Sequence, residues 1–148
     1  MLLLEVFNST YSYKLDAQEN LRNSSFWIYT FTTDDGSDIT VEIIEEEPEL
    51  FTVAFDRDGH DHTTDQGDAF KIFATVMKIL IEFVKERKPE EIHFTASKAA
   101  DIDGHVEKAS RTKLYDRMVN RFAGQFSYSF KAHDGANYRV YILKRKDK

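Results

Sequence analysis

Two histidines and several aspartates near residue 60 have the side-chain types of a transition-metal site. Residues 56–62 read DRDGHDH, and imidazole and carboxylate groups bind such metals. The segment does not fit a calcium-binding loop, because Gly59 falls at the fourth position and that loop has its glycine at the sixth. No third and fourth ligands follow His60 and His62 at regular spacing. We therefore interpret the segment as a solvated acidic loop and predict no bound metal there.

Tyr115 and His93 have the chemistry for proton transfer. Tyr115 has an ionisable hydroxyl, but it shares an apolar helix face with Leu114, Met118 and Phe122, which favours a place in the core. His93 falls on the polar side of a predicted strand and would serve as a general base near neutral pH. A hydrogen-bonded sheet histidine is the commoner role. No Ser/His/Asp triad, P-loop or zinc pattern is visible in the sequence.

These side chains must be positioned by a chain that alternates between strand and helix patterns. Aromatic and β-branched residues, clustered or alternating with polar ones, predict strands at 2–7, 26–33, 38–44, 50–57, 91–97, 126–131 and 138–144. The last two form a hairpin. We further predict a short strand at 11–15, a helical turn at 17–22 and an acidic turn at 45–49. Two helices separate the later strands.

The first helix is predicted over residues 68–87. Its polar residues recur in steps of four and three, so they form one narrow stripe: Lys71, Thr75, Lys78, Glu82 and Lys85. The rest of the circumference is apolar, so only this stripe should be exposed and Phe73 should lie in the core. Asp65 or Asp68 would cap the N-terminus, and Pro89 follows the last turn.

The second helix is predicted over residues 110–122, with Ser110 as its N-cap and Gly124 as the C-cap glycine. Together the elements predict an α+β fold: one mixed, mostly antiparallel sheet, a long central helix and a second helix. A chain of 148 residues favours a single domain over 1–148.

Several strands, a long helix, a strand, a shorter helix and a closing hairpin resemble the GNAT N-acetyltransferase fold over roughly residues 26–145. In that family a Gly-containing turn before the central helix holds the pyrophosphate of acetyl-CoA by backbone N–H groups and the helix dipole. The resemblance implies that acetyl-CoA, as co-substrate, would contact Thr64, Gln66, Gly67, Asp68 and Ala69. Thr64 stands where the family has Gln or Arg.

The resemblance extends to the second helix. Leu114-Tyr115 matches a Leu-Tyr pair of the family, which implies that Tyr115 protonates the departing CoA thiolate. Lys108 stands at the position of an asparagine that usually precedes this tyrosine by seven residues, and it is a further candidate for cofactor binding. The residues around the Gly turn are rich in aspartate, which would repel a polyanion such as CoA.

The formal charge separates the two halves of the chain. Residues 1–70 carry 16 acidic and 3 basic side chains, a net charge of −13, whereas residues 71–148 carry 10 and 17, a net charge of +7. One interpretation is that these are ordinary solvated faces of one fold. The sharper interpretation is an acidic surface that binds a basic partner or mimics nucleic acid.

Composition narrows the classes of function. The chain has no cysteine, which excludes disulfides and thiolate metal sites and favours an intracellular, cytoplasmic protein. The opening MLLLEVF is interpreted as a strand, and no stretch has the ~20 apolar residues of a membrane span. Trp27 and its aromatic neighbours would stack on bases, but they lack basic neighbours, so nucleic-acid binding is not expected.

Two hypotheses therefore stand, and the sequence leaves open whether the chain is an enzyme. The first is a GNAT-like acyltransferase that moves an acetyl group from acetyl-CoA to a small-molecule or protein amine. The second is a non-catalytic binding or inhibitor protein, such as a phage accessory protein, that keeps the scaffold and uses its acidic N-terminal surface to bind a basic protein.

Overall fold

The computed structural model describes residues 10–20, 25–34, 36–58, 66–97, 108–135 and 138–146. Side chains are described for these residues except 20, 57–58, 66–70, 97 and 108–112. The predicted strand at 2–7 and the DRDGHDH segment from residue 59 onward therefore lie outside the described residues, as does Thr64.

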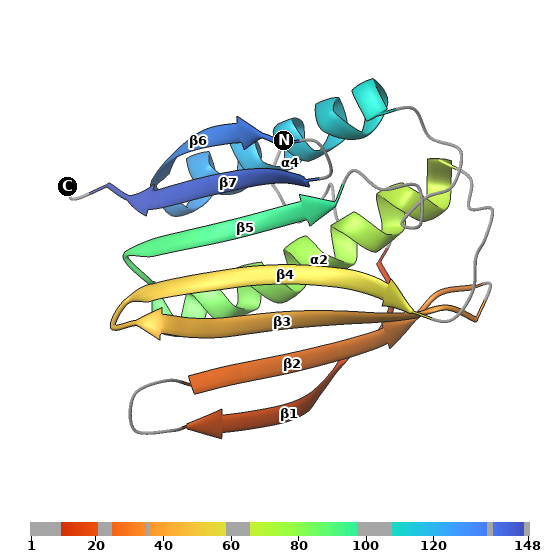
Figure 1. Ribbon diagram of the computed structural model, residues 1–148, viewed down its shortest axis with the longest axis horizontal. Coiled ribbons are helices and arrows are strands. Elements are labelled where there is room, and N and C mark those ends of the chain that lie inside the picture. Colours follow the sequence, from red (N-terminus) through yellow and green to blue (C-terminus); the bar gives the residue numbers. More distant parts are fainter. Residues whose placement is uncertain are drawn as a thin grey trace.

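The described strands form one mixed, seven-stranded sheet: β1 (Lys14–Asn20), β2 (Ser25–Thr32), β3 (Asp38–Glu47), β4 (Leu50–Asp58), β5 (Glu91–Ser97), β6 (Tyr128–Asp134) and β7 (Tyr138–Arg145). Their order across the sheet is β1-β2-β3-β4-β5-β7-β6. Every neighbouring pair is antiparallel except β4 and β5, which are parallel and are connected by a helix (Figure 1). The fold is α+β, as predicted.

Two helices, α2 (Gln66–Arg87) and α4 (Lys108–Phe126), cover one face of this sheet (Figure 1). They contact each other, and α4 also contacts β6 and β7. Both helices start at the end of the sheet where β4 and β5 finish. No helix in the described part of the chain has the length and apolar character needed to cross a membrane.

The core lies between the sheet and the helices. Alternate residues of the strands point into it, including Ile39, Val41 and Ile43 of β3, which have no exposed surface. From α2 the buried residues run around most of the circumference, and Phe73 is 1% exposed. The apolar pattern of the central helix therefore predicted its burial correctly, because only cover on several sides removes so much apolar surface from water.

One member of the predicted exposed stripe is buried. Thr75 has no exposed surface, because its hydroxyl accepts a hydrogen bond from the backbone N–H of Tyr11 at 2.8 Å and donates one to the carbonyl of Lys71 at 2.7 Å. The segment before β1 therefore lies across α2. A hydroxyl that is paired on both sides can be buried at little cost, which the helical period alone does not reveal.

The polar N-terminal segment differs from the prediction. Residues 14–20 form a seven-residue strand, so the helical turn predicted at 17–22 is wrong over its described residues. The strand pairs with β2 and has an irregularity between Leu15 and Ala17. Pairing with an existing strand satisfies its backbone groups and overrides weak local propensity. The acidic turn is also shorter than predicted, because β3 continues to Glu47 and only residues 48–49 turn.

The helix ends differ too. Asp68 lies inside α2 and does not cap it, and Ser110 lies inside α4, which starts at Lys108. Gly124 does not end α4 either, because the helix continues to Phe126. Ser127 then takes a left-handed conformation with φ of 64°, and this residue reverses the chain into β6.

Candidate functional site

The parallel pair β4 and β5 opens at its carboxyl end. The two strands pair from Leu50 opposite Glu91 to Ala54 opposite Thr95. Beyond that point β4 continues to Asp58 beside β3, and β5 continues to Ser97 beside β7. The described register between β4 and β5 thus ends while both strands go on, so the sheet splits between residues 55–58 and 96–97.

Of the residues implied to bind acetyl-CoA, all but Thr64 lie in the described part of the chain, at the N-termini of the two helices. Gln66, Gly67, Asp68 and Ala69 form the first turn of α2, and Lys108 is the first residue of α4. The N-termini of both helices lie at the end of the sheet where the opening is (Figure 1). Free backbone N–H groups and the helix dipoles make such termini favourable for anions.

Tyr115 lies in the core. It is 2% exposed and its ring centroid is 4.3 Å from that of Phe73 on α2, so it packs the two helices together. The core interpretation of the apolar helix face is therefore confirmed for its position. Trp27 is also buried, at 3% exposed, between Phe51, Phe83 and the guanidinium of Arg87, so it offers no surface for stacking on bases.

His93 lies on the face of the sheet opposite the helices, as its predicted polar side implied. Its Nε2 is 2.5 Å from a carboxylate oxygen of Glu91 on the same strand. The imidazole is half-buried and paired with Glu91, as expected for a hydrogen-bonded histidine on a sheet. Among the described residues no three His, Cys, Asp or Glu side chains gather as metal ligands. His60 and His62, for which no metal was predicted, lie outside those residues.

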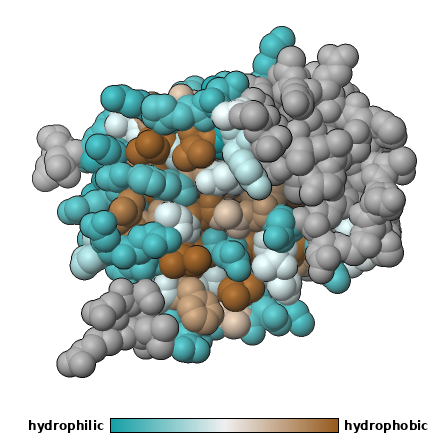
Figure 2. Space-filling view, viewed as in Figure 1, coloured by the Kyte–Doolittle hydropathy of each residue, from teal (hydrophilic) through white to brown (hydrophobic). Residues whose placement is uncertain are grey.

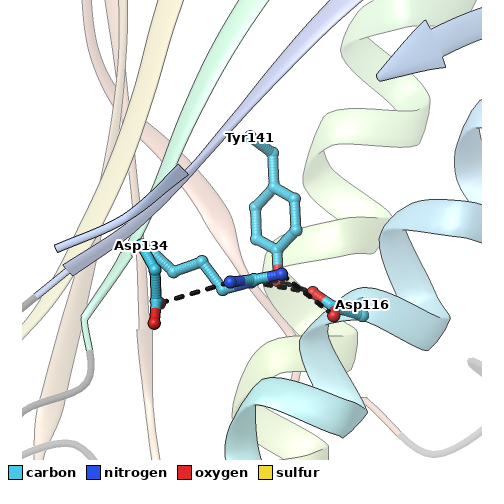
Figure 3. A network of polar contacts seen from close by, with 4 residues as sticks. Asp116, Asp134 and Tyr141 are labelled. Carbon is cyan, nitrogen blue, oxygen red and sulfur yellow. Dashed lines mark hydrogen bonds and ion pairs between the residues drawn. The ribbon is translucent and has the colours of Figure 1, made fainter. Parts of the chain in front are cut away.

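A polar network joins α4 to the sheet on the helix side (Figure 3). Arg139 of β7 donates from Nε and Nη2 to the two carboxylate oxygens of Asp116, at 2.9 and 3.1 Å. The Tyr141 hydroxyl donates to the same carboxylate at 2.5 Å, and Arg139 also reaches Asp134 at 3.2 Å. Sequence reasoning missed this network, because its members come from three different elements.

The pKa values of Arg139 and Tyr141 in this network are both raised. Burial lowers the pKa of Arg139, but its hydrogen bonds to Asp116 and Tyr141 more than compensate, so that the pKa is raised. Burial and the hydrogen bond to Asp116 both raise the pKa of Tyr141. Neither group therefore changes charge near neutral pH, and the geometry fits a clamp between α4 and β7 better than a proton-transfer site.

We expect stability to fall as the pH rises above about 10. Burial raises the pKa of Tyr128, whose hydroxyl donates to the carbonyl of Pro89, to about 12, and it raises that of Tyr141 as well. Unfolded tyrosine ionises near pH 10. The unfolded chain therefore loses these protons first, so the contribution of both groups is complete below pH 10 and declines towards pH 12.

Urea unfolding between about pH 8 and about pH 11 tests this expectation. The variant carrying Tyr128→Phe and Tyr141→Phe should show a flatter decline than the wild type. An equally steep decline in that variant would contradict the assignment to these two hydroxyls.

Comparison with known proteins identifies the family to which the chain belongs. The curated proteins include no match, and neither do the solved structures. The sequence model of one family, DUF6934, matches residues 11–146, a range that contains all seven described strands and both helices. The chain therefore belongs to the DUF6934 family, a family of unknown function.

Proposed function

We propose that this protein is a GNAT-like acyltransferase that moves an acetyl group from acetyl-CoA to an amine. The observation that carries the proposal is the opening between β4 and β5, with the first turns of α2 and α4 at the same end of the sheet. By the resemblance in element order, acetyl-CoA would lie where these two strands separate.

The opening suits the arm of the cofactor. Where two paired strands separate, backbone N–H and C=O groups that would otherwise bond across the pair are left for another partner. In this protein the two strands stop pairing with each other after Ala54 of β4 and Thr95 of β5. The pantetheine arm of CoA is extended and carries amides, so it can hydrogen-bond to such strand edges.

The phosphates would lie against the backbone of residues 66–69 at the start of α2, where the helix dipole favours an anion. Lys98, Lys108 and Arg111 would offset the aspartates of this region. The amine nitrogen would attack the thioester carbonyl, the C–S bond would break, and the thiolate would take a proton. Tyr115 is the candidate donor of that proton.

The burial of Tyr115 favours a second candidate. At 2% exposed and packed on Phe73, its side chain has the surroundings of a structural residue. A binding protein that keeps the scaffold without the chemistry needs no acid at this position. Its contact surface would be the acidic segment at the end of β3, where Glu46, Glu47 and Glu49 are exposed.

Calorimetric titration with CoA tests the proposal. Wild-type protein is expected to bind CoA, and Asp65→Asn with Asp68→Asn should tighten binding by about threefold to tenfold, more at low salt, because two like charges near the phosphates are removed. The matched control is Asp16→Asn with Glu86→Gln, two exposed positions on β1 and in the last turn of α2, which should leave the affinity unchanged.

The same titration separates the two candidates. Micromolar binding of CoA by the wild type would exclude the binding-protein candidate in this form. Failure of both the wild type and the Asp65/Asp68 variant to bind CoA would exclude acetyl transfer. In that case Glu47→Lys with Glu49→Lys should weaken binding of the basic partner protein.

A further inference from the structure

The face of the sheet opposite the helices carries apolar side chains that no described element covers. Figure 2 views this face, and hydrophobic residues lie among the hydrophilic ones across its described part. Five of them are half-buried: Phe26 and Ile28 of β2, Ile44 of β3, and Val140 and Ile142 of β7. A shallow cavity of about 230 Å³ lies beside Phe26, Ile28 and Ile44.

The strand registers arrange this face in rows that run across the sheet. One row starts at Glu19 on β1, passes Phe26 and Ile44 to Thr52 on the central strand β4, and continues through His93. It ends with Ile142 and then Lys131 on β6. The row thus begins with the acidic Glu19 and ends with the basic Lys131. The apolar Phe26 and Ile142 lie next to these two ends, and the small Thr52 lies at the centre.

The next row repeats this order without its acidic end. Ile28 of β2 lies in line with Ala54 of β4, and Ala54 lies in line with Val140 of β7. Ile28 and Val140 are each two strands from β4, as Phe26 and Ile142 are in the first row. Both rows are therefore symmetric about β4 in the apolar residues of β2 and β7, whereas Ile44 of β3 has His93 of β5 as its counterpart.

We propose that two copies of this chain associate through these faces, related by a twofold axis parallel to β4. Since β4 is the middle strand of seven, the rotation places β1 on β6, β2 on β7 and β3 on β5 of the second copy. Phe26 then faces Ile142 of the second copy, and Ile28 faces its Val140. Glu19 faces its Lys131, and Thr52 and Ala54 meet their own equivalents.

Charge complementarity supports a second copy as the occupant. The sheet order puts β1 and β3, whose charged residues are mostly acidic, on one side of β4, and β7, with three basic residues and no acidic one, on the other. On this face Glu42 adds to Glu19 and Lys144 adds to Lys131, while Glu91 of β5 is paired with His93 and Asp56 of β4 meets its own equivalent. The rotation lays each acidic half on a basic half, which an identical neighbour matches by symmetry.

The dimensions suit an interface of ordinary size. Seven strands spaced by about 4.8 Å span roughly 29 Å, and strands of seven to ten residues run roughly 23–33 Å. Sheets that pack face to face lie about 10 Å apart with strand directions within about 30° of each other, and a twofold axis parallel to β4 meets that condition.

Sedimentation velocity of the full chain over a concentration series tests the proposal. Lys131→Glu should raise the dimer dissociation constant about tenfold. The new carboxylate would repel Glu19 of the other copy, and a twofold dimer contains this contact two times. The double variant Glu19→Lys with Lys131→Glu restores opposite charges and should return the constant to within about threefold of the wild type. Lys113→Glu, on the exposed side of α4, is the matched control and should have no effect.

Ile28→Asp gives an independent test, since a carboxylate facing Val140 of the second copy should abolish the dimer. Circular dichroism establishes whether each variant is folded. If Ile28→Asp fails to fold, the charge variants at Glu19 and Lys131 still test the proposal, because they change no apolar residue. A wild type that stays monomeric up to about 1 mM would overturn the proposal. So would a dimer that Lys131→Glu leaves intact.

Discussion

Replacing Phe73 by alanine is expected to destabilise the protein by about 3–5 kcal/mol. The ring is 1% exposed and sits where α2, α4 and the sheet meet. Its centroid is 4.3 Å from that of Tyr115, 5.7 Å from that of Phe94 and 6.2 Å from that of Phe55. Alanine would leave a cavity walled by rings on both layers, which cannot move in to fill it without losing their own contacts.

Urea unfolding measures this loss as a lower midpoint at unchanged slope. Phe130→Ala is the matched control. Phe130 is half-buried on the outer strand β6, so folding removes less of its ring from water than of the Phe73 ring. Its loss should be clearly smaller. Equal losses in the two variants would show that Phe73 is not the centre of the core.

Replacing Asp116 by alanine is expected to cost about 2–3 kcal/mol. The change removes the carboxylate that accepts two hydrogen bonds from Arg139 and one from Tyr141. Arg139 is 16% exposed in its side chain, so its charge would lose its main partner without regaining full hydration. The Asp116 side chain is 41% exposed, which keeps the expected cost below that of a fully buried ion pair.

Asp134→Ala provides the matched control for this network. Asp134 contacts the same guanidinium at 3.2 Å but is 56% exposed, so its removal should cost under about 1 kcal/mol. Arg139→Lys should lose much of what Asp116→Ala loses, because lysine cannot make the paired contact with both carboxylate oxygens. A cost for Asp116→Ala no larger than that for Asp134→Ala would contradict the clamp between α4 and β7.

The elements whose patterns are local were predictable from the sequence. The alternation from Ile92 to Ala96 gave β5 at its observed bounds, and the narrow polar stripe of α2 correctly implied that Phe73 is buried. These patterns record which side of a segment faces water, and burial of apolar surface is the largest favourable term in folding. The same reasoning placed Tyr115 on an apolar face and therefore in the core.

Features that depend on partners elsewhere in the chain were not predictable. Residues 17–20 became strand because β2 offers them a partner, and Thr75 is buried because the N–H of Tyr11 reaches its hydroxyl. Asp116, Arg139 and Tyr141 carry no pattern in common, and only the packing of α4 over β7 brings them together. Such contacts join residues far apart in sequence, where periodicity holds no information.

The sequence by itself determined the α+β class, the burial of the central helix and the separation of charge between the two halves of the chain. Only the tertiary structure decided where those halves lie. The strand order places β4 at the centre, with the acidic strand β3 on one side and the basic strand β7 on the other. The register ends the pairing of β4 with β5 at Ala54 and Thr95. Strand order and register are set by contacts between strands, because a strand's own residues fix which face it buries but not which neighbour it joins.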